Sequence, residues 1–257
     1  MRRHTSFFLL LTMVFGAVTG VGIWFVIGLV NPAGTSVLIH GFVFGWAIEW
    51  VFFLVEIVAL LVYHYQFHRL PGPTRARVAA IYAVAAWLSL VVINGILSFM
   101  LTPGAWLQTG DFWDGFFNPT FAPSLVYRTF VCLTLAGLFA FVTAVEERRV
   151  RQRQRLLGIA TRWAVVPMLG LAGSTWWYYR ALPEAIRADL LTRNPQATGY
   201  VHLIPAAAVG LVLLAVLAAR RLPRAVQGVL AALLVLLGLG LTAPMEYLRE
   251  IARKPYV

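Results

Sequence analysis

The feature of this sequence that most constrains its fold is a series of long apolar runs separated by short polar breaks. Most runs hold about 20 residues or more, the length that a helix needs to cross a bilayer core of roughly 30 Å. Lipid offers the backbone no hydrogen-bond partner, so each run is expected to be helical. The seven runs cover residues 6–30, 35–65, 78–101, 124–145, 156–178, 200–219 and 226–241.

The breaks between the runs carry residues that end helices, such as Asn31-Pro32 and Leu222-Pro223. The sequence therefore predicts an all-α fold, a polytopic transmembrane helix bundle of about seven spans. A chain of 257 residues has room for these spans and short connections. We expect one transmembrane domain over residues 1–257, ending in a short external tail over residues 243–257.

Composition and charge agree with a membrane protein. Hydrophobic residues make up 60% of the chain and charged residues only 12%, against about a quarter charged in soluble domains. The net charge of +11 comes from arginines clustered in alternate breaks, which is a topology signal and not a nucleic-acid-binding surface. The positive-inside rule predicts a cytoplasmic N-terminus and an external C-terminus.

Two carboxylates, Glu49 and Glu56, lie inside an apolar run. Ionisable groups at this depth are costly and usually functional. Their spacing of seven residues returns to nearly the same helix face, about 10 Å further along the axis. Together they would form a ladder for protons. The alternative is a pair of protonated carboxyl groups that hydrogen-bond to neighbouring helices.

Two histidines, His40 and His202, fall in the outer part of a predicted helix. Either imidazole could ligate a haem iron. A hydrogen-bonded structural histidine is an equal alternative at each position. The other three histidines lie near cytoplasmic helix ends, where an interfacial position is expected.

The C-terminal segment brings Glu246 and Glu250 onto one helical face, because they are four residues apart. A carboxylate there could ligate a metal, with Arg249, Arg253 and Lys254 holding haem propionates. The charge pattern alone favours a different interpretation, in which the segment is an interfacial tail whose basic side chains contact phospholipid.

Several short segments have a defined order and spacing along the chain. They are Thr19-Gly20, Ala47-Ile48-Glu49, Phe52-Phe53, Glu56, Asn94-Gly95, Phe112-Trp113, Asn118-Pro119, Arg128-Thr129, and Glu250, Arg253 and Pro255. In this arrangement they resemble subunit I of the cytochrome bd-type quinol oxidases. The resemblance covers most of residues 16–129 and returns at the C-terminus.

The resemblance implies roles for some of these residues. Glu49 and Glu56 would lie beside the oxygen-reducing haem and its proton path, as catalytic residues. Glu250 would ligate a high-spin haem b, with Arg253 near the propionates. His202 stands beside the position where the family has a methionine ligand, so Glu250 and His202 are the candidate metal ligands.

The sequence also departs from this family. The family's first helix, which carries a histidine ligand of the oxygen-reducing haem, has no counterpart, so another membrane subunit is expected to supply it. Tyr127-Arg128 stands where the family has the histidine of its low-spin haem. The external quinol-binding loop is reduced to residues 180–199. Direct quinol oxidation is therefore not expected.

These features predict a haem-binding electron-transfer subunit of a cytochrome bd-like respiratory oxidoreductase in the inner (plasma) membrane, carrying haem b or haem d. Electrons would come from a partner such as a c-type cytochrome, and whether oxygen is the acceptor stays open. The alternative is a haem-free structural or assembly anchor. A proton-coupled transporter using Glu49 and Glu56 is less favoured, because the sequence shows neither duplicated halves nor interrupted helices.

Overall fold

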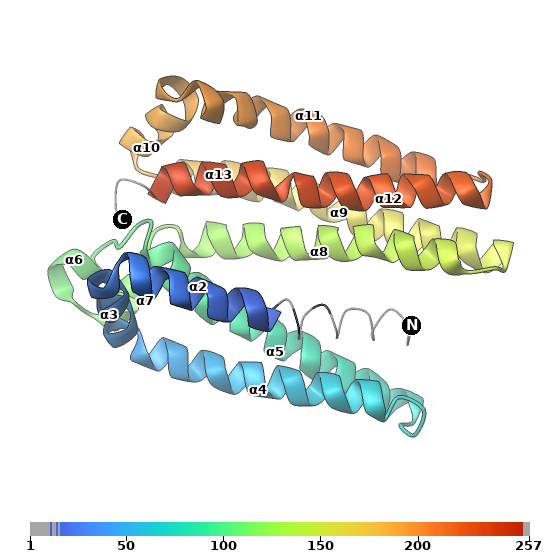
Figure 1. The fold of residues 1–257 in the computed structure, drawn as a ribbon, viewed down its shortest axis with the longest axis horizontal. Coiled ribbons are helices and arrows are strands. Elements are labelled where there is room, and N and C mark those ends of the chain that lie inside the picture. Colours follow the sequence, from blue (N-terminus) through green and yellow to red (C-terminus); the bar gives the residue numbers. More distant parts are fainter. Residues whose placement is uncertain (1–10, 12–13, 15, 254–257) are drawn as a thin grey trace. The chain divides into compact units, whose positions relative to one another are not determined.

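The computed structural model describes residues 11, 14 and 16–253, and it contains only helices and their connections over these residues. The predicted all-α fold class is therefore confirmed. The chain divides into two compact units, each described by itself. Unit 1 comprises Met1–Leu97 and Gly104–Phe116, and unit 2 comprises Ser98–Pro103 and Phe117–Val257. Figure 1 shows the helices of each unit.

Six helices in the described part of the chain are long and apolar enough to cross a membrane. They correspond to six of the seven predicted runs, and they make the chain a multi-pass membrane protein. The first predicted run, residues 6–30, lies partly outside the described residues, and its described part is helix α2. The six helices are Val43–Tyr65, Gly72–Phe99, Phe121–Glu146, Val150–Ala181, Pro195–Ala218 and Arg224–Ala252.

Unit 1 begins with α2 and a short helix that follows a sharp break. Proline at the first position of the second helix stops α2, because it has no N–H to continue the ladder. The Asn31 side chain caps the new helix by accepting a 2.9 Å hydrogen bond from the Gly34 N–H. The helices of unit 1 are α2 (Gly16–Val30), α3 (Pro32–Gly41), α4 (Val43–Tyr65), α5 (Gly72–Phe99), α6 (Trp106–Thr109) and α7 (Phe112–Phe116).

The predicted run over residues 35–65 is divided at Phe42, so the expectation of uninterrupted helices is wrong here. The backbone of Phe42 leaves helical geometry at φ −121° and ψ 26°, and Figure 1 shows α3 at an angle to α4. The Phe42 side chain is only 1% exposed, and its ring packs against Phe112 at 5.6 Å. Burial of the large Phe42 ring stabilises the bend more than a regular helical turn would stabilise a straight helix. The hydrophobic pattern alone could not indicate this bend.

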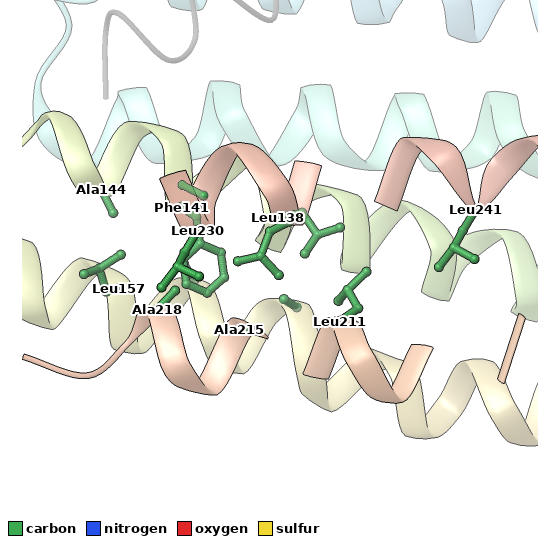
Figure 2. Close-up of a cluster of buried hydrophobic side chains, with 13 residues drawn as sticks. Leu138, Phe141, Ala144, Leu157, Leu211, Ala215, Ala218, Leu230 and Leu241 are labelled. Carbon is green, nitrogen blue, oxygen red and sulfur yellow. The ribbon is translucent and has the colours of Figure 1, made fainter. Parts of the chain in front are cut away.

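Unit 2 is a bundle in which α8 pairs with α9, α12 packs on α8, and α11 packs on α12. Figure 2 shows its apolar core, with Leu138 and Phe141 of α8 facing Leu157 of α9 and Leu211 of α11. The elements of unit 2 are α8 (Phe121–Glu146), α9 (Val150–Ala181), α10 (Glu184–Ala188), the π-helix η2 (Asp189–Arg193), α11 (Pro195–Ala218), α12 (Arg224–Gly240) and α13 (Thr242–Arg253).

Gly137 allows α8 and α9 to approach closely. A Cβ atom at this position would collide with the backbone of Trp163 and Ala164. Small residues at such crossings are typical of membrane helices, whose association depends on close packing and not on exclusion of water. The α8–α9 pair is therefore fixed by backbone contact at this point.

The segment after residue 242 continues the last span as a helix. The apolar helix Arg224–Ala252 has 29 residues, which corresponds to about 43 Å at 1.5 Å per residue. This length exceeds a bilayer core of about 30 Å, so α13 extends beyond it. The predicted tail over residues 243–257 is thus helical as far as Arg253, and residues 254–257 lie outside the described part.

Candidate functional site

The two carboxylates predicted to be functional lie on one face of α4, and the first contacts α5. The Ser89 hydroxyl donates a 3.0 Å hydrogen bond to Glu49 Oε1. Both side chains are half-buried within unit 1. The Glu49 carboxyl group therefore has a defined polar partner inside a span.

Glu56 has a second partner on the same neighbouring helix. Tyr82 of α5 lies close enough to Glu56 for an electrostatic interaction, and so does Glu49. Both Glu56 and Tyr82 are half-buried. A phenol beside a carboxyl group offers both a donor and an acceptor for a proton.

These four groups follow one register. Glu49 and Glu56 are seven residues apart on α4, and Tyr82 and Ser89 are seven apart on α5. Seven residues return to nearly the same azimuth on a helix. Since α5 returns antiparallel to α4, Glu49 is hydrogen-bonded to Ser89, and Glu56 lies within electrostatic range of Tyr82. We call these two pairs the rungs of a carboxyl–hydroxyl ladder.

Sequence reasoning identified the carboxylates of this ladder and missed its hydroxyls. A serine and a tyrosine inside an apolar run are common and carry no charge. The signal that could have found them is the matching interval of seven residues on consecutive helices. Which face of α5 meets α4 depends on the rotation of the helices, which the sequence does not state.

His40 lies in unit 1 on the connecting helix α3, not in a span. Its Nδ1 is 2.7 Å from the Ser36 carbonyl oxygen and 3.3 Å from the Ser36 hydroxyl. The first contact fits a protonated Nδ1 that donates to the carbonyl, and this tautomer leaves Nε2 as an acceptor. His40 is exposed. His40 therefore offers one free-standing imidazole as a candidate ligand, and it belongs to neither of the two rungs.

The C-terminal candidates lie on α13 in unit 2, where they surround one arginine. Arg249 binds Glu246 Oε2 through Nε at 2.7 Å and through Nη2 at 2.6 Å. Its Nη2 is 3.9 Å from Glu250 Oε1. Glu246 is therefore engaged with Arg249, whereas the Glu250 side chain keeps 52% exposure and a looser contact. The side chain of Arg253 lies outside the part of the chain that the structure describes.

His202 does not face α13. The neighbouring Tyr200 of α11 contacts the Tyr247 ring of α13 at 5.2 Å, and Gln196 accepts a 2.8 Å hydrogen bond from the Tyr247 hydroxyl. Two residues correspond to a rotation of about 200°, so His202 lies on the other side of α11, where it is exposed.

Tyr127 and Arg128 of α8 contact the start of α13. The Tyr127 hydroxyl lies 3.0 Å from the Met245 sulfur. Arg128 interacts electrostatically with Glu246 and Arg249. The residues at this position therefore form a polar contact between helices of unit 2.

The α13 donors fit a b-type haem in one respect. Glu250 offers one carboxylate group that could ligate an iron, with the Arg249 guanidinium group 3.9 Å away. Among the described residues there is no cluster of three or more His, Cys, Asp or Glu side chains that could hold a metal ion.

The site residues thus fall into two groups. Glu49, Glu56 and His40 belong to unit 1, and Glu246, Arg249, Glu250 and His202 belong to unit 2. Among known proteins, no family model and no curated protein matches this chain.

Proposed function

We propose that this chain is a membrane subunit of a cytochrome bd-like respiratory complex in the inner (plasma) membrane, in which the carboxyl–hydroxyl ladder conducts protons and Glu250 ligates a haem b. The observation that carries the proposal is the pairing of Glu49 with Ser89 at 3.0 Å inside a span. A single intramembrane carboxyl group can be structural. Two carboxyl groups in register with two hydroxyl groups favour proton transfer.

The ladder suits proton transfer because each rung contains a group that can both give and take a proton. The rungs are about 10 Å apart along α4, so a proton passing between them needs a water molecule or a side-chain movement. Glu56 is the second proton-transfer group, with Tyr82 within electrostatic range.

A b-type haem would supply one-electron transfer at the α13 end of unit 2. Glu250 would hold the haem iron through its carboxylate, and Arg249 would pair with a propionate. The Glu250 side chain is half exposed, so a partner subunit would have to cover the haem. This agrees with the expectation that another chain supplies a ligand-bearing helix.

The haem part of the proposal is tested on the complex purified with its partner subunits. A reduced-minus-oxidised spectrum should show a b-type signal, and Glu250→Ala should remove or alter it. Glu184→Ala, at an exposed position of α10, is the matched control and should leave the spectrum unchanged. A complex without any haem signal, or a Glu250→Ala complex with an unaltered spectrum, contradicts this part.

The ladder is tested separately by proton uptake into vesicles that contain the complex. Glu49→Gln and Glu56→Gln should each slow uptake by about a hundredfold, a typical effect of removing a proton-transfer group. Glu146→Gln, which is exposed at the end of α8, should have no effect. Unchanged uptake in both ladder variants would refute proton conduction by α4.

The second candidate is a haem-free anchor or assembly subunit. The observation in its favour is that Tyr200 of α11 contacts α13, whereas His202 lies about 200° around the same helix. An anchor needs the helix bundle alone. The complex would therefore assemble normally and keep full activity with each of the variants Glu49→Gln, Glu56→Gln and Glu250→Ala. That combination of results distinguishes it from the first candidate.

A further inference from the structure

Three arginines share one exposed face of α9. Arg155 lies four positions after Arg151, and Arg162 lies eleven positions after Arg151. These spacings place them about 40° and 20° around the helix from Arg151. All three are exposed. They therefore form a cationic line that runs from the start of α9 into its apolar part.

The same face becomes apolar immediately after Arg162. Val166 is 62% exposed and Leu169 is 76% exposed. A shallow groove of about 300 Å³ lies on this helix, lined by Arg162, Trp163, Val166 and Pro167. Arg162 is thus the charged end of a groove whose other lining residues are apolar.

The direction of the side chains extends this arrangement. Side chains on a helix lean toward its N-terminus, so Arg162 leans toward Arg155 and toward the basic end of α9. Its Cα lies only about 10 Å from that of Arg155 along the axis. An arginine at this depth reaches the headgroup layer while its methylene groups stay in hydrocarbon.

The charges on this face are not neutralised within the described residues. None of the three arginines forms an ion pair there, and the ion pairs found involve Arg249. Arg153, on another face of α9, is buried and donates a 3.0 Å hydrogen bond to Gln227. The cationic line therefore needs a counter-charge from outside the chain, and the groove next to it needs an apolar occupant.

We propose that this face of α9 is a binding site for a phospholipid with an anionic headgroup. Arg155 and Arg162 bind the phosphate, and an acyl chain lies in the groove along Trp163, Val166 and Pro167. No soluble anion satisfies both halves of the site. A zwitterionic lipid would fill the groove but brings no net charge to the arginines.

The test uses the full chain purified in detergent and native mass spectrometry to measure retained lipid. Phosphatidylglycerol should bind more tightly than phosphatidylcholine with the same acyl chains. Arg155→Gln/Arg162→Gln should weaken phosphatidylglycerol binding by roughly twentyfold, since each arginine near an anionic surface contributes about fivefold. Phosphatidylcholine binding should not change.

Arg180→Gln is the matched control. Arg180 lies at the opposite end of the same helix, also beside a tryptophan, with its guanidinium 4.8 Å from the Trp176 ring centroid. This variant should keep full phosphatidylglycerol binding. Equal affinity for the two lipids, or an unchanged affinity in the double variant, overturns the proposal. Displacement of the lipid by glycerol 3-phosphate alone would indicate a site for free anions and would also overturn it.

A second variant examines the groove independently of charge. Val166→Ser removes exposed apolar surface next to Arg162. It should weaken the binding of both lipids to a similar degree. Circular dichroism of every variant checks that the helices are retained. Full binding of both lipids to Val166→Ser would contradict the position assigned to the acyl chain.

Discussion

The Ser89 hydroxyl donates its hydrogen bond to a Glu49 carboxylate oxygen that is 40 residues earlier in the chain. This contact connects two membrane-spanning helices of unit 1 through polar groups inside otherwise apolar segments. Hydrogen bonds between membrane helices contribute about 0.6 kcal/mol on average and up to about 1.7 kcal/mol. The bond is therefore worth too little to justify a half-buried carboxyl group inside a span by stability alone, which favours a functional role for Glu49.

Ser89→Ala should lower the free energy of unfolding by about 0.6–1.7 kcal/mol and change the infrared absorption of the Glu49 carboxyl group. Unfolding in mixed detergent measures the first effect, and the signal lost in Glu49→Gln identifies the second. Thr175→Ala is the control, because the Thr175 hydroxyl bonds only the Leu171 carbonyl within α9. An infrared spectrum unaffected by Ser89→Ala would argue against this hydrogen bond.

Gly137→Ala should destabilise unit 2 by about 1–3 kcal/mol, the usual cost of overpacking. The added methyl group would meet the backbone of α9 at Trp163 and Ala164, and backbone cannot rotate away as a side chain can. Gly173→Ala, with open space around its Cβ position, should be neutral or stabilising by up to about 1 kcal/mol. Equal unfolding free energies for the two variants would contradict the close approach.

Gln227→Leu should cost about 1–3 kcal/mol of stability, because it leaves buried polar groups without partners. The Gln227 side chain accepts from Arg153 Nε at 3.0 Å and donates to the Arg220 carbonyl at 2.9 Å. Gln152→Leu, at an exposed position of α9, serves as the control and should change stability by less than about 0.5 kcal/mol. Thermal unfolding in detergent provides the comparison.

Phe42→Ala should destabilise unit 1 by about 3–5 kcal/mol, the range for removing a buried aromatic side chain. Phe44→Ala should cost much less, since Phe44 is 70% exposed, although its ring also contacts Phe112 at 6.5 Å. Limited proteolysis between α3 and α4 would detect the loosened bend. Equal sensitivity of the two variants would count against Phe42 as the residue that fixes this bend.

The apolar runs predicted the long helices well, because length and hydropathy decide what can cross a bilayer. They could not predict the bend at Phe42, which depends on Phe112, or the rotation that brings Ser89 to Glu49. The spacing of Glu246 and Glu250 predicted a helical face, and residues 242–253 are helical. The apolar runs also could not state the rotation of α11, which places Tyr200 against Tyr247 of α13.

The equal interval between the rungs on α4 and α5 determines which changes in chain length unit 1 can accept. One residue inserted between Glu49 and Glu56 would rotate the following part of α4 by about 100°. Glu56 would then leave Tyr82 while Glu49 kept Ser89. Insertions and deletions are therefore tolerable in the connection at residues 66–71. Within the helical segment between the rungs, they would break one rung while the other is kept.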